Sequence, residues 1–144
     1  MFKFYLKRPL PGDFKYLYSI ISKNLKEKCL PQSLLQSYFE EMISGDKSIV
    51  LTVNNGNRMA GFAYVTEVFS LACGHYAEVV DFQTVEYYRK NGADEYLLRA
   101  VEQWASQMFC SEIRFFAREE VRINLLERLN YTKDENSHYY RKRL

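Results

Sequence analysis

The 144 residues, 47% of them apolar, suffice for one domain with a sizeable core, which we expect to span residues 1–144. Twenty Lys and Arg against 18 Asp and Glu give a net charge of only +2, too weak a field to argue for nucleic acid or an anionic membrane as partner. The sequence has no run of about 18 apolar residues and no signal-peptide pattern, and Cys29, Cys73 and Cys110 lack the spacing of a disulfide framework or a zinc site. These features predict a soluble cytoplasmic protein without a metal.

The first half of the chain predicts a strand, two helices and a hairpin. Apolar residues alternate over 2–6 and indicate a strand that nearby prolines end. Asp13 is the expected N-cap of a helix reaching about Lys28, and a second amphipathic helix closes at Gly45. The hairpin is predicted from a β-branched run at 48–53, a turn at 54–57 and a strand at 59–69.

In the second half, the hydrophobic period changes from two to about 3.6 near residue 85. This change predicts a strand over 76–84 that leads into a helix beginning near Gly92. Further elements are expected at 113–117 (strand), 119–129 (helix) and 138–144 (strand). Hairpin-linked strands mixed with helices indicate an α/β (α+β) domain with a mixed sheet flanked by helices, not a doubly wound sheet or a barrel.

The turn between that strand and that helix has features that suit a phosphate-bearing ligand. It offers unpaired N–H groups at a helix start, the positive end of the helix dipole, and two cations. A glycine and a lysine are also common in such turns for conformational and solubility reasons. The turn residues are Arg89, Lys90, Asn91, Gly92, Ala93 and Asp94.

With its flanks, this turn resembles the acyl-CoA-binding motif of the GNAT superfamily of N-acyltransferases. The family pattern is Arg or Gln, two variable residues, Gly, one variable residue, then Gly or Ala; Arg89 and Gly92 fit it, whereas Asp94 does not. About thirty residues carry specific motif content. The resemblance implies a mostly antiparallel sheet whose strands at 76–84 and 113–116 are parallel neighbours that splay apart.

The resemblance also implies where acetyl-CoA binds as the acyl donor. The main chain at the end of the first splayed strand would face the thioester and pantetheine arm, and the N–H groups of the turn would face the pyrophosphate. The implied cofactor-binding residues are Phe82, Thr84, Val85, Arg89, Lys90, Asn91, Gly92, Ala93 and Asp94.

Glu78 is the implied general base, because several family members carry a Glu or His at this spacing before the arginine of the loop. A strict strand alternation would place Glu78 on one face with Val80 and Phe82, and Asp81 on the opposite face as a structural residue. Glu67 is a reserve candidate. An ordinary strand glutamate, solvated or hydrogen-bonded, is the alternative interpretation of Glu78.

The tyrosine that serves as general acid in many family members is missing, since its position is Leu126 and the helix-closing glycine is Asn130. Tyr131 follows that position and is expected in the core. His75 and His138 are expected to be structural, satisfied by solvent or a backbone carbonyl.

We therefore predict an N-acetyltransferase that moves an acetyl group directly from acetyl-CoA to a primary amine of a small molecule or protein. The alternative is a catalytically degenerate protein of this fold that binds acyl-CoA or a protein partner, and Asp94 and the missing tyrosine favour it. A nucleic-acid-binding domain ranks last, because no basic, aromatic-studded sheet motif is found. Neither nucleic acid nor membrane is an expected partner, and formation of a homodimer is left open.

Overall fold

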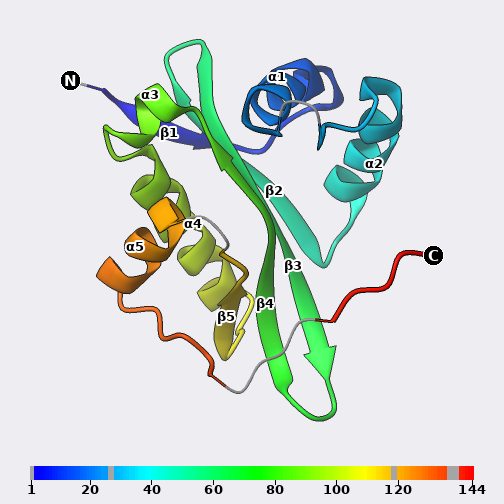
Figure 1. The fold of residues 1–144 in the computed structure, drawn as a ribbon, viewed down its shortest axis with the longest axis vertical. Helices are drawn as coiled ribbons and strands as arrows, with labels where there is room; N and C mark the ends of the chain where they lie inside the picture. Colours follow the sequence, from blue (N-terminus) through cyan, green and yellow to red (C-terminus); the bar gives the residue numbers. More distant parts are fainter. Residues whose placement is uncertain (1, 26–27, 118–119, 136–139) are drawn as a thin grey trace.

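A five-stranded sheet forms the centre of the computed structural model, which describes residues 2–25, 28–117, 120–135 and 140–144 (Figure 1). The strand order is β1-β2-β3-β4-β5, with antiparallel pairing from β1 to β4 and parallel pairing of β4 with β5. The strands are β1 (Phe4–Lys7), β2 (Ser48–Asn55), β3 (Arg58–Ser70), β4 (Gly74–Thr84) and β5 (Glu112–Phe115).

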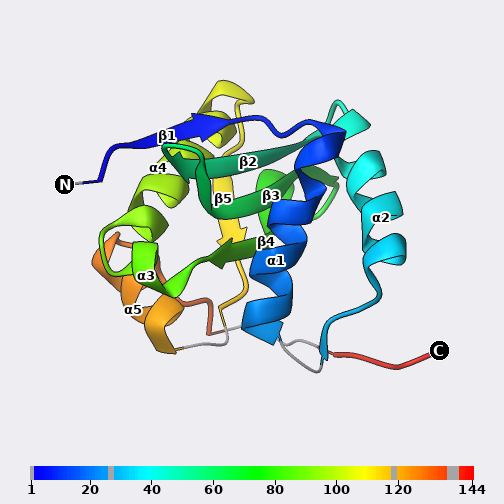
Figure 2. The ribbon, with the colours of Figure 1, turned by 90° about the horizontal axis from the view of Figure 1, so that it is seen from above.

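Helices cover both faces of the sheet, as Figure 2 shows from above. One face carries α1 and α2, and the other carries α3, α4 and α5. Within the described residues, no helix is both long and apolar enough to cross a membrane. The helices are α1 (Phe14–Leu25), α2 (Gln32–Ser44), α3 (Glu86–Arg89), α4 (Ala93–Gln107) and α5 (Glu120–Arg128), with a 3-10 turn η1 (Pro11–Asp13) before α1.

The alternation of side chains along the strands builds two hydrophobic cores. On the α4 side, Val65 and Val79 of the sheet pack with the apolar face of α4, including Leu97. On the α1 and α2 side, Phe62 packs with a smaller set that includes Phe39. The predicted α+β class and the mostly antiparallel sheet with flanking helices are therefore confirmed.

Two predicted details at the ends of elements are wrong. The Asp13 carboxylate accepts a hydrogen bond from the N–H of Leu10 at 2.8 Å, so it closes the η1 turn behind it instead of capping α1 ahead of it. Residues 140–144 form no strand; residues 138 and 139 of that prediction lie outside the described part of the chain. The short helix α3 was not anticipated.

A bulge interrupts β4, the strand next to the edge strand β5. Tyr64 lies opposite Asp81 and Val65 lies opposite Val79, so Val80 is an extra residue in β4. The extra residue shifts the alternation, and Phe82 joins Val79 in the core on the α4 side. A bulge bends its strand, and the pairing of β4 with β5 ends at this point, whereas its pairing with β3 continues.

Candidate functional site

Strands β4 and β5 are parallel neighbours that diverge, as predicted. Their pairing begins at Tyr76 with Glu112 and ends at Val79 with Phe115, immediately before the bulge. Beyond this point a cavity of about 270 Å³ opens between them. It is lined by residues 79–83 of β4, by Phe115, Phe116 and Ala117 at the end of β5, and by Arg122 of α5.

Three side chains fill the floor of this opening. The rings of Phe82 and Phe115 meet edge to face across it, with centroids 5.2 Å apart. The buried guanidinium of Arg122 lies 5.1 Å from the centre of the Phe82 ring. These side chains lie where the two strands stop pairing, and Arg122 places a cation beside the cavity.

The cavity begins nearer the start of β4 than the resemblance implied. Of the three strand residues expected to face the donor, Phe82 lines it, whereas Thr84 and Val85 do not. The Thr84 carbonyl accepts hydrogen bonds from Arg89 and Asn24, and the Val85 N–H donates to the Ala60 carbonyl. These main-chain groups of Thr84 and Val85 are therefore already occupied.

Arg89 and Asp94 form a brace with Thr84 beneath the turn. The Thr84 hydroxyl donates to Asp94 Oδ1 at 2.5 Å, and Arg89 donates to the Thr84 hydroxyl and carbonyl at 3.0 Å each. Arg89 Nε also lies 3.8 Å from Asp94 Oδ2. Asp94 is only 5% exposed, so its carboxylate points into the protein and is neutralised there. This placement favours a structural role for Asp94 over repulsion of a bound pyrophosphate.

The free N–H groups at the start of α4 also differ from those expected. The N–H groups of Lys90, Asn91 and Gly92 donate to carbonyls of α3 at 3.3, 3.0 and 3.2 Å and are therefore used within the turn. Those of Ala93 and Asp94, together with the next one at Glu95, donate to no acceptor in the described part of the chain. The N–H groups left unpaired at the start of the helix are thus those of residues 93–95.

Gly92 has a backbone conformation that favours glycine. Its φ is +96°, in the left-handed region, and a Cβ built on it would meet nothing within 4 Å. The glycine therefore allows the chain to turn from α3 into α4. A hollow of about 470 Å³ lies on the outer side of Gly92, between Leu6 of β1 and the exposed face of α4.

The carboxylates of β4 are arranged differently from the strict alternation. Because Val80 is the extra residue, Glu78 and Asp81 share the face that carries Tyr64, while Phe82 lies on the other. Glu78 is half-buried among the paired residues, before the cavity begins. Asp81 lines the cavity and is an exposed residue, and the partial desolvation of its carboxyl raises the pKa above its ordinary value.

Glu67, the reserve candidate, is engaged elsewhere. Its carboxylate lies 2.7 Å from Nε2 of His75, near the start of β4 and away from the cavity. The expectation that His75 is satisfied by solvent or a backbone carbonyl is therefore wrong, and His138 lies outside the described residues.

The helix position of the missing general acid is occupied by Leu126. Leu126 is buried in the core, and Asn130, with φ of +68°, closes α5 as a glycine would. Tyr131 packs against the core and donates to Glu102 Oε2 at 3.1 Å. Burial and the Glu102 carboxylate raise the pKa of Tyr131, which is the structural residue predicted.

Sequence reasoning missed the two charged residues of the cavity, Asp81 and Arg122. Asp81 was assigned to the wrong face because one inserted residue reverses the alternation, and a single valine gives no local sign of it. Arg122 lies on a helix distant in sequence, and its charge gave no reason to expect it in a core. The only sequence signal for a buried Arg122 was its position within the apolar pattern of the helix predicted at 119–129.

Comparisons with known proteins identify the fold. No family model and no curated protein matches the sequence. Among solved structures, AAC(6')-Iy in complex with the bisubstrate analogue CoA-S-monomethyl-acetylneamine is similar with a TM-score of 0.82 and 16% identity, over 99% of each chain. A GNAT family acetyltransferase from Staphylococcus aureus has a TM-score of 0.77 and 16% identity over 100% of both chains. The aminoglycoside antibiotic 6'-N-acetyltransferase AAC(6')-Ih from Acinetobacter baumannii has a TM-score of 0.77 and 15% identity over 99% of each chain. The chain has the GNAT acetyltransferase fold.

Proposed function

We propose that this chain, which has the GNAT acetyltransferase fold, transfers an acetyl group from acetyl-CoA to a primary amine. The observation that carries the proposal is the end of the β4–β5 pairing at Val79 and Phe115, which opens a cavity beside the bulge. Where the pairing of two parallel strands ends part-way along β4, backbone donors and acceptors are exposed. The amide-containing pantetheine arm can pair with them as a missing strand would. The protein would act in the cytoplasm.

The donor would extend from this cavity to the start of α4. Its pyrophosphate would accept hydrogen bonds from the N–H groups of Ala93, Asp94 and Glu95, at the positive end of the helix. Lys90 has an exposed ammonium group in a weak pair with Glu86 at 3.8 Å and supplies a mobile cation there. Arg89 would act by positioning the turn, because its Nε and Nη2 donate to Thr84.

The amine would approach from the face that carries α1 and α2. A protonated amine cannot attack a thioester, so a carboxylate must first accept its proton, directly or through water. Two candidates share this face: Glu78, implied by the resemblance, and Asp81, favoured by its place in the cavity lining and its raised pKa. A carboxyl with a raised pKa is a stronger base when ionised, which supports Asp81.

Calorimetric titration of the full chain with acetyl-CoA tests the proposal. We expect one molecule to bind per chain, and a mixture with amines should release free CoA thiol. The amine panel should include aminoglycosides, because two of the similar structures act on or bind such compounds by name, and a polyamine and a peptide with a free N-terminus as other primary amines. Absence of binding to acetyl-CoA would contradict the proposal.

Turnover of Asp81→Asn and Glu78→Gln against pH identifies the base. We expect Asp81→Asn to lower kcat by about 100-fold with acetyl-CoA affinity unchanged, whereas Glu78→Gln lowers it by less. The deficit should be largest between the raised pKa of Asp81 and the pKa of the amine. Below that interval the wild-type carboxyl is itself protonated, and above it the amine loses its proton unaided. The reverse order of the two variants would assign the base to Glu78.

A catalytically degenerate protein is the second candidate, and the buried Leu126 in place of the tyrosine favours it. Such a protein would bind acetyl-CoA with no release of CoA thiol for any amine. Leu126→Tyr distinguishes loss of one acid from loss of the whole site, since turnover gained by this variant would show that only the acid was missing.

A further inference from the structure

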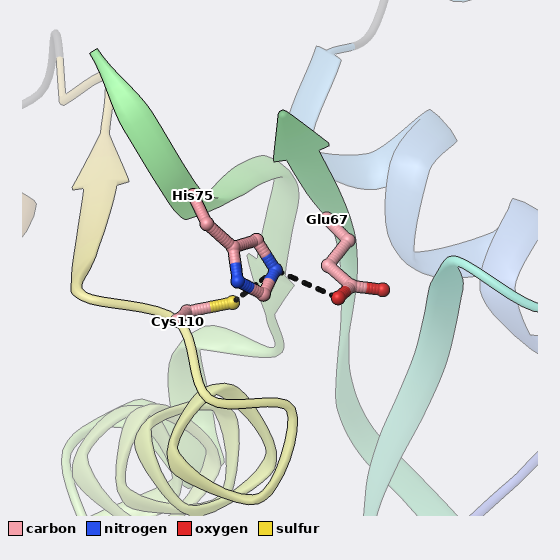
Figure 3. A group of neighbouring side chains, drawn as sticks. All are labelled: Glu67, His75 and Cys110. Carbon is pink, nitrogen blue, oxygen red and sulfur yellow. Dashed lines mark hydrogen bonds and ion pairs between the residues drawn. The ribbon is translucent and has the colours of Figure 1, made fainter. Parts of the chain in front are cut away.

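A second cluster of reactive side chains lies at the end of the sheet opposite the cavity. Glu67 comes from β3, His75 from the start of β4, and Cys110 from the loop between α4 and β5 (Figure 3). One carboxylate oxygen, one imidazole nitrogen and the thiol sulfur lie within 4.8 Å of one another. All three residues are half-buried.

The backbone fixes these three side chains relative to one another. Antiparallel pairing sets Glu67 opposite Ala77 and Phe69 opposite His75, so Glu67 and His75 are diagonal neighbours on one face. The N–H and the hydroxyl of Ser111 both donate to the His75 carbonyl at 2.8 Å, which ties the residue after Cys110 to the start of β4.

The end of α4 and an aromatic ring complete this positioning. The Cys110 N–H donates to the Ala105 carbonyl at 3.0 Å, closing α4 with Phe109 at φ of +61°. The Phe69 ring stacks on the His75 ring, with centroids 4.2 Å apart and planes within 8°. Both the direction of the Cys110 side chain and the plane of the imidazole are thereby set.

The contacts exclude a catalytic relay among these residues. Glu67 Oε1 lies 2.7 Å from His75 Nε2, and Cys110 Sγ lies 3.7 Å from the same nitrogen. A Cys-His-Glu relay needs the thiol and the carboxylate on different ring nitrogens. Here both converge on one nitrogen, as they would around a shared cation.

We propose that Glu67, His75 and Cys110 bind a divalent transition metal, with Zn²⁺ as the best match and a water as fourth ligand. Sulfur, imidazole and carboxylate are ligands that Zn²⁺ takes together, with bonds of about 2.0–2.3 Å that place ligand atoms about 3.4–3.7 Å apart in a tetrahedron. The Sγ to Nε2 separation of 3.7 Å already fits. The Nε2 to Oε1 pair, at 2.7 Å, must open by less than about 1 Å as the metal replaces their shared proton.

The site would serve structure and not the transfer reaction. It joins the β3–β4 hairpin to the α4–β5 loop at the start of the β4–β5 pair, whereas the cavity lies beyond the end of that pairing. A bound metal would thus fix the paired end of two strands whose other ends must stay apart. Metal bound only to the folded chain stabilises that fold by mass action.

Titration of the metal-free full chain with ZnCl₂, and with CoCl₂ as a spectroscopic probe, tests this site. We expect one Zn²⁺ per chain, a higher Tm, and with Co²⁺ a thiolate charge-transfer band together with the d–d bands of a tetrahedral site. Cys110→Ser should remove the charge-transfer band and weaken Zn²⁺ binding by about 100-fold or more. Glu67→Gln should keep the band but weaken binding.

Cys73→Ser is the matched control, because Cys73 is an exposed thiol outside the cluster, in the turn between β3 and β4. It should leave affinity, bands and Tm shift unchanged. Circular dichroism of each metal-free variant shows whether it is folded, and Glu67→Gln supplies a second test if Cys110→Ser is not. Absence of Zn²⁺ binding, a band that survives Cys110→Ser, or a band lost only in Cys73→Ser would overturn the proposal.

Discussion

At the scale of single residues, the role inferred for Asp94 from the motif differs from the role indicated by its contacts in the structure. In sequence it departs from the family pattern and suggests a charge against the pyrophosphate, yet its carboxylate is buried against Thr84 and Arg89. Removing the buried partner of a cation lowers the stability of the fold by more than an exposed ion pair adds to it. The residue is therefore expected to support the turn and not to impede the donor.

We predict that Asp94→Ala lowers the free energy of unfolding by about 2–3 kcal/mol, because it leaves the buried Thr84 hydroxyl without its acceptor and Arg89 without its carboxylate partner. Urea denaturation measures this loss. Glu95→Ala is the control, since Glu95 lies in the same turn with a half-exposed pair to Arg99 and should change stability by less than about 0.5 kcal/mol. Acetyl-CoA affinity that rises in folded Asp94→Gly and falls back with salt would show instead that the carboxylate reaches the phosphates.

At the scale of elements, the bulge at Val80 connects the fold to the cavity. Deleting Val80 would restore a regular alternation, because Val79, Asp81 and Phe82 would then occupy successive positions on alternate faces. The core residues of β4 would keep their faces, while the bend that separates β4 from β5 would be lost.

We predict that the Val80 deletion folds but does not bind acetyl-CoA, since the strands would pair beyond Phe115 and close the cavity. Circular dichroism melting checks the fold, and calorimetry checks binding. Val80→Ala keeps the extra residue and should bind normally. Full affinity in a folded deletion variant would contradict a role for the bulge.

The same bulge marks the limit of what the sequence could predict. Periodicities within one element were sufficient for the hairpin and for α4, because each depends on neighbours along the chain, whereas the divergence of β4 from β5 was expected only from the family resemblance. The phase of β4 beyond Val79 depends on how it pairs with β3, and the Glu67, His75 and Cys110 cluster depends on three segments that meet only in the fold. Neither leaves a periodic signal.

At the scale of the whole molecule, the two faces of the sheet differ in how much they bury. Among the described residues, 20 buried residues form the core on the α4 side, against six on the side of α1 and α2. A layer that buries less apolar area has a smaller free energy of local opening, so it opens more often. The proposed donor site lies on the side with the larger core, and the amine would enter on the side with the smaller core.

We predict that α1 and α2 exchange their amide hydrogens faster than α4 does, and through local opening. Hydrogen exchange with mass spectrometry measures this, and Phe39→Ala, in the smaller core, should speed exchange in α1 and α2 while α4 stays protected. Leu98→Ala, in the larger core, is the matched variant and should speed exchange throughout, because its loss of about 2–5 kcal/mol falls on the global unfolding. Equal protection of α2 and α4, or a Phe39→Ala effect spread over the sheet, would mean that both layers open as one unit. The acceptor side could then not rearrange around different amines while the donor site stays formed.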